Sequence, residues 1–509
     1  MHFANFNELL AENARVRPGH KAVTFEGETW TYGELETTSR AIAAALYRAG
    51  IRKGDRVAVM LPNQPMFLGA LFGAARIGAV PVLVNVFYGT DEILGILRHS
   101  QSKLLFVEPV VRGAKLQGAV EEARKKGDLP DLETLWTVEG GALSAGTPAP
   151  DAPDASREIR GSDLALMIYT SGTTGSSKGV MLTYEGLLEN ARVTAGLMKY
   201  SDEDTLLPAL PLFSSAGVSL TLISMIAGTH IVLIERNNPQ IILETIERER
   251  VTILDMVPSG LKLLMKFNRT AGHDTSSLRL VVVGGDSSPP DVGRAVLDDL
   301  KCNFAVVYGL TETSPVVSIT HLDATEEQRV ATVGPPIDGM ECSIRDESGR
   351  ALPAGEIGEV CCKGLYVMPG YFRNEEGTRQ CIDDAGWFHT GDLGTIREDG
   401  HLVISGRKKD MVIVGGHNVF PAEVESHLIK HPAIKEVAVV GMEHPALGNY
   451  LVAFVLLKTP GLSAGDVQAF CNGLAQFKVP QRVLFPETFP YTGSGKVNKR
   501  ELRRILETQ

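Results

Sequence analysis

Apolar residues recur at helical spacing, and then in short continuous runs, through the first third of the chain. Residues Leu35–Gly50 place apolar side chains at helical spacing and end in glycine, a common helix stop, so they predict a helix. A buried strand is predicted at Asp55–Leu61, a second helix at Met66–Ala79 and a second strand at Val80–Asn85. Because strands and helices alternate in this way in proteins whose parallel sheets are covered by helices, the pattern predicts an α/β fold.

Three later apolar runs end in polar loops. They are Leu164–Gly175, Leu278–Asp286 and Phe304–Thr313, and each breaks into glycine together with hydroxyl or acidic residues. In open parallel sheets, ligands bind outside the carboxyl ends of the strands. If the three strand ends converge, they form one polar site.

The longest apolar stretch, Val218–Ile234, is interrupted by Gly228, Thr229 and His230. It therefore predicts a helix, a turn and a strand rather than a membrane-spanning helix. The N-terminal residues contain no basic segment followed by an apolar core, so we expect no secretory signal and no integral membrane segment. Residues Gly140–Gly161, rich in Ala, Pro, Gly and Ser, predict a surface loop or linker.

Size and composition narrow the class of protein further. A chain of 509 residues exceeds what one hydrophobic core serves, so two or more domains are expected. A net charge of −11 without a long basic run argues against nucleic-acid binding, which requires clustered Lys and Arg. The six cysteines form no C-x-x-C pair and no zinc-like spacing, which predicts reduced, mostly buried thiols in a cytoplasmic protein.

The loop Tyr169–Met181 (YTSGTTGSSKGVM) concentrates glycine, serine and threonine around one lysine. It follows an apolar strand and precedes Leu182–Val193, which predicts a helix. Backbone N–H groups of such a loop can bind phosphate. The Walker A pattern requires a glycine before the lysine and Ser or Thr after it, whereas here Ser177 precedes Lys178 and Gly179 follows. The loop is therefore a different phosphate loop, and a polar turn without a ligand is the alternative.

One further motif precedes this loop in the sequence, and several others follow it. They are Thr31–Leu35 (TYGEL), Tyr308–Thr313 (YGLTET), Gly355–Val360 (GEIGEV), Gly370–Phe372 (GYF), Trp387–Gly394 (WFHTGDLG), Gly406–Gly416 (GRKKDMVIVGG) and Gly493–Arg500 (GSGKVNKR). With the loop at Tyr169–Gly179, the series resembles the adenylate-forming ligases, a family that includes acyl-CoA synthetases, luciferases and the adenylation domains of peptide synthetases. The resemblance runs over nearly the whole chain.

The resemblance implies an α/β fold in three parts. Residues 1–405 would form a large N-terminal domain of two α/β sheets plus a small β-rich subdomain, residues 406–410 a hinge, and residues 411–509 a small mobile α+β lid. It also implies two half-reactions that use ATP, Mg²⁺ and coenzyme A. A carboxylate attacks the α-phosphorus of ATP and releases pyrophosphate, and the thiol of coenzyme A then displaces AMP to form a thioester.

The resemblance assigns roles to individual residues. Lys496 would bridge the reacting groups, Thr311 would contact the α-phosphate, and Glu312 would bind Mg²⁺, so these three would be catalytic. Binding of ATP or AMP is implied for loop residues around the phosphates, for residues beside the adenine and for a pair at the ribose: Thr170, Ser171, Gly172, Thr173, Thr174, Gly175 and Lys178; Gly285, Asp286 and Tyr308; Asp392 and Arg407. This chemistry needs charge neutralisation and positioning more than a covalent catalyst.

Each assignment has a structural alternative. Taken alone, Lys496 would be a solvated surface lysine, Asp392 a turn or cap residue, and Tyr308 a core residue. His389 is interpreted as a structural histidine with satisfied hydrogen bonds.

Two further groups of residues are implied for the second substrate and the acid. Lys409 occupies the family's pivot position, and Gly415 and Gly416 resemble the loop that lines the thiol's path. The acyl pocket would be mostly apolar and lined by Ser214, Val218, Val257, Pro258 and Gly284.

Three positions depart from residues that are frequent in the family. Ser214 and Tyr184 stand in place of histidines, and Asn449 stands in place of a glutamate. The change at Ser214 removes an aromatic neighbour near the substrate carboxylate, which reshapes the pocket and weakens an aryl-substrate interpretation. We therefore expect an acyl-CoA synthetase for a medium- or long-chain fatty acid.

Other functions remain open at this point. One is a ligase that passes the acyl group to a carrier-protein thiol, and another is an aryl-CoA ligase. A non-catalytic nucleotide-binding remnant and oxidative light emission on the same fold are further alternatives. The oligomeric state is also open, with a homodimer as one alternative.

Overall fold

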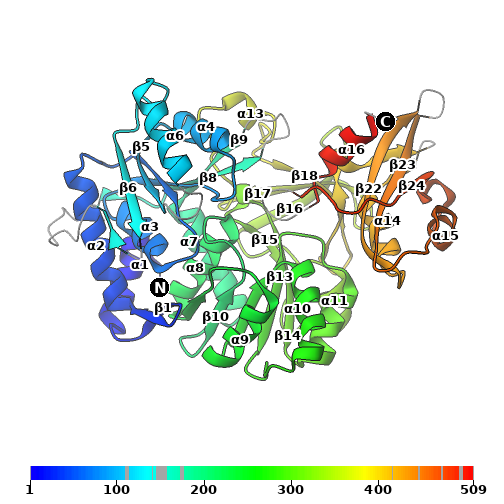
Figure 1. The fold of residues 1–509 in the computed structure, drawn as a ribbon, viewed down its shortest axis with the longest axis horizontal. Coiled ribbons are helices and arrows are strands. Elements are labelled where there is room, and N and C mark those ends of the chain that lie inside the picture. Colours follow the sequence, from blue (N-terminus) through cyan, green and yellow to red (C-terminus); the bar gives the residue numbers. More distant parts are fainter. Residues whose placement is uncertain are drawn as a thin grey trace. The chain divides into compact units, whose positions relative to one another are not determined.

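The computed structural model describes residues 2–108, 114–139, 142–144, 158–171, 177–414, 417–444, 448–471, 474–491 and 497–507. The chain, drawn in Figure 1, divides into two compact units. Unit 1 comprises Met1–Cys342 and Cys362–Phe388, and unit 2 comprises Ser343–Cys361 and His389–Gln509.

The first sheet of unit 1 has the strand order β7-β6-β5-β3-β4-β8-β9. Its strands are β3 (Arg56–Met60), β4 (Val80–Leu83), β5 (Ser102–Val107), β6 (Thr134–Glu139), β7 (Ala142–Leu143), β8 (Leu164–Ser171) and β9 (Ser177–Thr183). The inner strands pair in parallel, whereas β7 and β9 pair antiparallel with β6 and β8 at the two edges.

The second sheet of unit 1 has the order β15-β14-β13-β12-β10-β11-β1-β2. Its strands are β1 (Lys21–Phe25), β2 (Glu28–Thr31), β10 (Thr205–Pro208), β11 (His230–Leu233), β12 (Ile253–Met256), β13 (Leu280–Gly284), β14 (Asn303–Gly309) and β15 (Val316–Ile319). It is parallel from β1 to β14, with β2 and β15 antiparallel at its edges.

Helices pack against both sheets. They are α1 (Phe6–Val16), α2 (Tyr32–Arg48), α3 (Pro65–Arg76), α4 (Thr90–Ser100), α6 (Ala114–Lys125), α7 (Tyr184–Leu197), α8 (Ser215–Ala227), α9 (Pro239–Glu249), α10 (Pro258–Ala271), α11 (Pro290–Ala295), α12 (Glu326–Ala331) and α13 (Glu375–Arg379). Every residue of α3 is buried, as expected of a helix that is apolar all round. This helix contacts β3 and β4 of the first sheet and β1 of the second.

Helices α9, α10 and α11 cover one face of the second sheet (Figure 1). Leu254 of β12 and Val283 of β13 form a buried cluster with Ile246 of α9, Leu261 of α10 and Val292 of α11. Alternate residues of a strand point to opposite faces, so these side chains anchor the strands against the helices. The carboxyl ends of the strands lead into polar loops. The motif loops after β13 and β14 begin there.

A small sheet has the order β16-β17-β18-β19, and the boundary between the two units passes through it. Its strands are β16 (Met340–Arg345), β17 (Gly358–Gly364), β18 (Phe388–Ile396) and β19 (Leu402–Arg407). The C-terminal sheet of unit 2 has the order β21-β20-β23-β22, with β24 paired to β23. Its elements are β20 (Val412–Val414), β21 (His417–Val419), α14 (Pro421–Leu428), β22 (Ile434–His444), β23 (Gly448–Leu457), α15 (Ala464–Phe470), β24 (Arg482–Leu484) and α16 (Lys499–Glu507).

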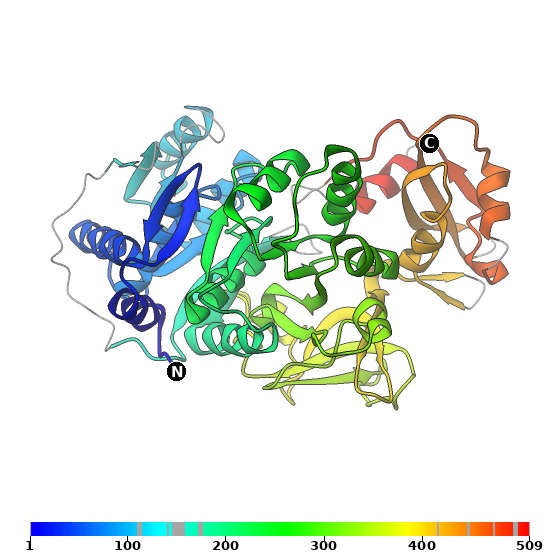
Figure 2. The same ribbon diagram turned by 90° about the horizontal axis from the view of Figure 1, so that it is seen from below.

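The C-terminal sheet is buried on both faces. Val439 and Ala453 belong to a core that includes Val424 of α14 and Val467 of α15. Their neighbours along the strands face the other way and pack against α16, as Phe454 does. Figure 2 shows α16, in red, and α15, in darker orange, on opposite sides of this sheet.

The α/β fold predicted from the sequence is confirmed, with small shifts at element ends. Helix α2 begins at Tyr32, earlier than expected, because a capping box forms: Glu34 N donates to Thr31 Oγ1 at 3.2 Å, and Thr31 N donates to Glu34 Oε2 at 2.7 Å. Helix α8 ends at Ala227 and is capped by Gly228, whose φ is +79°, and β11 follows, so the interrupted apolar stretch is a helix, a turn and a strand. Among the described residues, no helix is long and apolar enough to cross a membrane.

One expectation about the glycine-rich loop is wrong, and another depends on two sheets rather than one. The loop was expected to lead directly into a helix, but β9 intervenes and pairs antiparallel with β8, so the described flanks of the loop form a hairpin. The three polar strand ends were expected to form one polar site if they converge. Strands β13 and β14 are neighbours in the second sheet, whereas β8 belongs to the first. Contact between the hairpin and the second sheet therefore depends on side chains and on a third segment of chain.

Candidate functional site

Glu312 lies in a short 3-10 turn, Thr311–Thr313, directly after β14. Tyr371 Oη donates a hydrogen bond to Glu312 Oε1 at 2.9 Å, and Met368 N donates to the Glu312 carbonyl at 2.8 Å. Burial, together with the adjacent Glu312 carboxylate, raises the pKa of Tyr371 far above its ordinary value. The hydroxyl therefore keeps its proton and acts as the donor. Both the backbone and the side chain of Glu312 are thus held by one segment, residues 368–371.

The same segment is bound to the hairpin. Phe372 N donates to the Gly179 carbonyl at 2.8 Å, and Met181 N donates to the Gly370 carbonyl at 3.2 Å. These bonds place Tyr371 opposite Val180 of β9. Lys178 Nζ lies 4.7 Å from the centroid of the Tyr371 ring, within the range of a cation–π contact. The ring of Tyr371 thus contacts the lysine of the loop, and its hydroxyl contacts Glu312.

Close packing fixes the turn that carries Thr311 and Glu312. A Cβ on Gly309 would lie 1.7 Å from the Pro315 carbonyl oxygen, so only glycine fits there. The hydroxyl of Thr313 lies 3.0 Å from the Pro315 carbonyl oxygen, within hydrogen-bond distance. Thr311 Oγ1 lies 3.1 Å from Ser215 Oγ, at the start of α8. Ser215 and Tyr371 are two site residues to which sequence analysis assigned no role.

The residues expected beside an adenine lie on neighbouring strands. Gly284 at the end of β13 pairs with Val307 of β14, one residue before Tyr308. Gly285 has a φ of +75°, which favours glycine, and it turns the chain sharply at the strand end. Asp286 is exposed, and its Oδ1 accepts a hydrogen bond from Ser287 N at 2.8 Å. The structure thus brings Gly285, Asp286 and Tyr308 to adjacent strand ends.

The hydroxyl of Ser214 is used in capping α8. Ser214 Oγ donates to the Pro211 carbonyl at 2.7 Å and accepts a hydrogen bond from Gly217 N at 3.1 Å. Val218, one turn further, is fully buried, and Val257 and Pro258 form the start of α10. A pocket lined by these residues stays a prediction. The capping role explains the serine at position 214 without a ligand.

The other two positions that depart from residues frequent in the family are Tyr184 and Asn449, and the structure explains only the first. Tyr184 is fully buried and meets Phe6 edge to face with ring centroids 4.8 Å apart, so it is a core residue. Asn449 pairs with Glu443 across β22 and β23. The structure gives no reason for an asparagine at that position.

The residues expected at a ribose lie in unit 2. Asp392 of β18 and Arg407 of β19 are direct partners in the antiparallel register. Arg407 Nε lies 2.7 Å from Asp392 Oδ1, and the Asp392 side chain is 5% exposed. Thr390 Oγ1 accepts a hydrogen bond from Asp392 N at 3.0 Å. This buried carboxylate is therefore oriented by its strand and paired with a cation.

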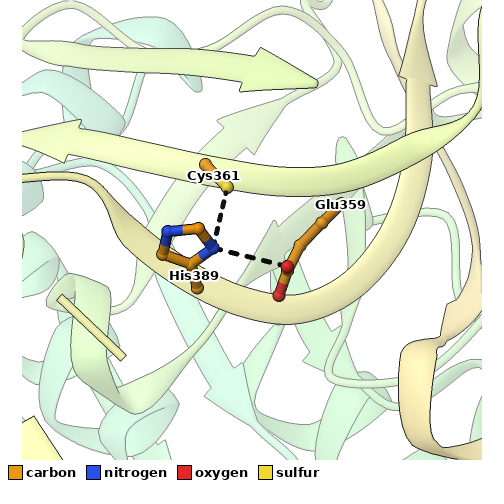
Figure 3. A group of neighbouring side chains, drawn as sticks. All are labelled: Glu359, Cys361 and His389. Atoms are coloured by element: carbon orange, nitrogen blue, oxygen red, sulfur yellow. Dashed lines mark hydrogen bonds and ion pairs between the residues drawn. The ribbon is translucent and has the colours of Figure 1, made fainter. Parts of the chain in front are cut away.

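A second carboxylate of unit 2 lies beside His389. Figure 3 shows His389 Nδ1 between Glu359 Oε2, at 3.3 Å, and Cys361 Sγ, at 3.5 Å. The three potential ligand atoms lie within 4.8 Å of one another, a proximity that sequence spacing did not reveal. Lys408 Nζ also contacts Glu359 Oε2 at 3.0 Å, so the group needs no metal ion to balance its charge. His389 has hydrogen-bond partners, as expected of a structural histidine.

Several sequence-predicted residues lie outside the described part of the chain. They are Gly172, Thr173, Thr174, Gly175, Gly415, Gly416 and Lys496. Thr170 and Lys178 are direct partners across β8 and β9, and Ser171 is the last described residue of β8. Lys409 lies exposed in a 3-10 turn after β19.

The chain is similar to known proteins over nearly its whole length. The family model described as AMP-binding enzyme matches residues 10–372, and the AMP-binding enzyme C-terminal domain matches residues 423–496. The putative acyl-CoA synthetase YngI of Bacillus subtilis is 32% identical, covering 98% of this chain and 96% of that protein. The feruloyl-CoA synthase of an Amycolatopsis species is 34% identical, covering 96% and 97%. Among solved structures, the anthranilate CoA ligase AuaEII in complex with anthranoyl-AMP aligns with a TM-score of 0.89 at 26% identity, covering 99% and 97%.

Proposed function

Because this chain belongs to the AMP-binding enzyme family, whose members are ATP-dependent ligases, we propose that it activates a carboxylic acid as an acyl-adenylate and transfers the acyl group to coenzyme A. The observation that carries the proposal is the joint placement of Lys178, Tyr371 and Glu312. Tyr371 contacts both the ammonium of Lys178, on the hairpin, and the carboxylate of Glu312, after β14. Such an arrangement suits a ligand that carries both phosphates and a metal ion.

The residues of unit 1 have roles that fit adenylation. The Lys178 ammonium would neutralise phosphate charge, and the loop residues Thr170–Gly175 would donate hydrogen bonds to the phosphates. The hydroxyl of Thr311, next to that of Ser215, would contact the α-phosphate. The chain then contributes mainly by positioning the acid and ATP, without a covalent intermediate on the protein.

Glu312 fits Mg²⁺ by the chemistry of its side chain. Mg²⁺ takes carboxylate and other oxygen ligands, and Glu312 offers a carboxylate on a short turn. When bound, Mg²⁺ would reduce the negative charge on the phosphates of ATP. Tyr371 would hold one oxygen of Glu312 throughout.

Residues of unit 2 have proposed roles at the ribose, in adenylation and in the transfer to the thiol. Asp392, paired with Arg407, would accept hydrogen bonds from ribose hydroxyls. Lys496 would bridge the reacting groups in adenylation, and Lys409 would be the pivot before the second half-reaction. Gly415 and Gly416 would line the path of the thiol. The proposed domains are residues 1–405, a hinge at 406–410, and a lid at 411–509.

The acid is proposed to be apolar, with a medium- or long-chain fatty acid as the first candidate. An aromatic acid is the second candidate, and a specific observation favours it: the feruloyl-CoA synthase is 34% identical over nearly the full length of both chains. The similar structure AuaEII is likewise an anthranilate ligase. A carrier-protein thiol is the alternative acceptor.

The test is a panel of acids, from acetate to long-chain fatty acids together with benzoates and hydroxycinnamates. Pyrophosphate and AMP are measured with and without coenzyme A. Pyrophosphate release that is followed by thioester formation only when coenzyme A is present supports the proposal and identifies the acid. Adenylate without consumption of coenzyme A would replace coenzyme A by a carrier protein. The absence of pyrophosphate with every acid would overturn the proposal.

A further inference from the structure

Tyr371 is buried, 8% exposed, yet both ends of its side chain contact charged groups. The ring faces the Lys178 ammonium at 4.7 Å, and the hydroxyl donates to Glu312 at 2.9 Å. Lys178 lies in β9 of the first sheet, whereas Glu312 lies in the turn after β14 of the second sheet, far away in the sequence. One side chain therefore links the phosphate-loop hairpin to the proposed metal ligand.

Hydrogen bonds hold the backbone of Tyr371 on several sides. Hydrogen bonds on both sides of it, from Phe372 N to Gly179 O and from Met181 N to Gly370 O, hold it against β9. Tyr371 N also donates to Thr378 Oγ1 at 2.9 Å, which ties it to α13. The backbone of Tyr371 is thus held in place, and the bond from its hydroxyl to Glu312 orients the ring.

We propose that Tyr371 is a positioning residue: its hydroxyl orients the Glu312 carboxylate for a divalent cation, and its ring holds the Lys178 ammonium for phosphate. This inference rests on the proposed function, because it assigns Tyr371 to the same ATP site. A hydrogen bond to Oε1 fixes the rotamer of Glu312 and leaves the other oxygen for the metal ion. Residues that orient metal ligands in this way are typically worth about 10- to 100-fold in metal affinity.

Two substitutions separate the two contacts. Tyr371→Phe removes the bond to Glu312 and keeps the ring beneath Lys178, whereas Tyr371→Leu removes both. Because Glu312 is half-buried, water can replace the lost donor, and phenylalanine fills the same space, so Tyr371→Phe retains the fold. Tyr366→Phe is the matched control. That tyrosine is also buried in unit 1, and its hydroxyl donates to the Asp338 carbonyl without contacting Glu312.

The experiment measures ATP binding by calorimetry without acid, as a function of Mg²⁺ concentration, together with the melting temperature. For Tyr371→Phe we expect the Mg²⁺ concentration for half-maximal ATP binding to rise about 10-fold, while ATP affinity at saturating Mg²⁺ changes less than about threefold. For Tyr371→Leu we expect the same shift and, in addition, weaker ATP binding at saturating Mg²⁺. Tyr366→Phe should leave the Mg²⁺ dependence unchanged even if it lowers the melting temperature.

The outcomes distinguish this inference from the proposed function. A folded Tyr371→Phe protein with the wild-type Mg²⁺ dependence overturns the inference, whether or not the wild type releases pyrophosphate. Equal Mg²⁺ shifts in Tyr371→Phe and Tyr366→Phe also overturn it, because the effect would then be general. If the Mg²⁺ shift is specific to Tyr371 but no acid yields pyrophosphate, the positioning role stands and the proposed function fails.

Discussion

Arg407 Nε lies 2.7 Å from Asp392 Oδ1, and the two residues face each other directly across β18 and β19. The next residue, Lys408, contacts Glu359 of β17 at 3.0 Å. Two consecutive cations are therefore held by carboxylates of neighbouring strands. The predicted pivot Lys409 follows immediately and is exposed. A rotation at Lys409 would therefore begin directly after two residues that are held by ion pairs.

Arg407→Ala should weaken ATP binding and lower stability. Loss of the guanidinium leaves the buried Asp392 carboxylate without this partner, but Arg407 is half-exposed, so we expect a loss of about 1–2 kcal/mol in the free energy of unfolding. Arg407→Lys keeps the charge and should recover part of both losses. Urea denaturation and ATP titration measure the two effects. Arg350→Ala removes an exposed ion pair with Asp346 and should change stability by less than about 0.5 kcal/mol; an equal effect of the two changes would contradict the prediction.

Gly309→Ala should disrupt the turn that carries Thr311 and Glu312. A Cβ at this position would overlap the Pro315 carbonyl oxygen at 1.7 Å, so the backbone must move. We expect a loss of about 2 kcal/mol or more in the free energy of unfolding and weaker Mg²⁺-dependent ATP binding. The control is Gly118→Ala in the exposed face of α6, where no atom lies within 4 Å of the added Cβ. That change should raise stability by about 0.5–1 kcal/mol. A Gly309→Ala protein with unchanged stability and ATP binding would refute the steric argument.

The sequence predicted the α/β fold because its strands and helices are long, apolar and regularly alternating. It did not predict β9, because the serine, lysine and glycine at the start of that strand are typical of a loop, and only the pairing with β8 makes them a strand. The role of Tyr371 was equally hidden. Its contact with Glu312 joins residues 59 positions apart, and neither residue type reveals the other.

Family motifs identified positions, but they did not determine what each side chain contacts. Ser214 illustrates this: its place in a motif predicts a pocket residue, but the motif does not predict that its hydroxyl caps α8. His389 and Cys361 likewise meet only because β17 and β18 are neighbours in one sheet. Contacts between strands depend on register, which a single sequence determines poorly.

His230 should make the protein less stable as the solution becomes mildly acidic. Burial, helped by the nearby Lys21 charge, lowers its pKa to about 4 from an ordinary 6.5, and its Nε2 lies 2.7 Å from Thr24 Oγ1. The unfolded chain binds a proton near pH 6.5 but the folded chain only near pH 4, so stability falls as pH decreases between these values, by up to about 3 kcal/mol. Urea denaturation of the wild type and of His230→Gln at several pH values measures this contribution. The variant should show a smaller loss across that window, and parallel curves would argue against the assignment.

Asp255 should have the opposite pH dependence. Burial in β12 raises its pKa to about 8 from an ordinary 3.8, so the folded chain keeps a proton that the unfolded chain releases. The stability contributed by the protonated carboxyl is complete below pH 3.8 and is lost as pH rises towards about 8. Asp255→Asn removes the titration and should be more stable than the wild type at alkaline pH, with a difference that grows on the order of 3 kcal/mol between about pH 5 and about pH 8. A difference that stays constant with pH would mean that Asp255 does not titrate in this range.

Lys496→Ala should separate the two proposed half-reactions. The lysine is proposed to bridge the acid and the α-phosphate only during adenylation, so its loss should slow pyrophosphate release by roughly 10²–10³-fold, the scale of one transition-state donor. Thioester formation from supplied acyl-adenylate and coenzyme A should remain near the wild-type rate, because a rotation at Lys409 would present another face of the lid for that step. Lys409→Pro is the complementary variant, since a fixed φ should impair the thioester step more than adenylation. Equal losses in both steps for Lys496→Ala would mean that one lid position serves both reactions, and the proposed pivot would then have no purpose.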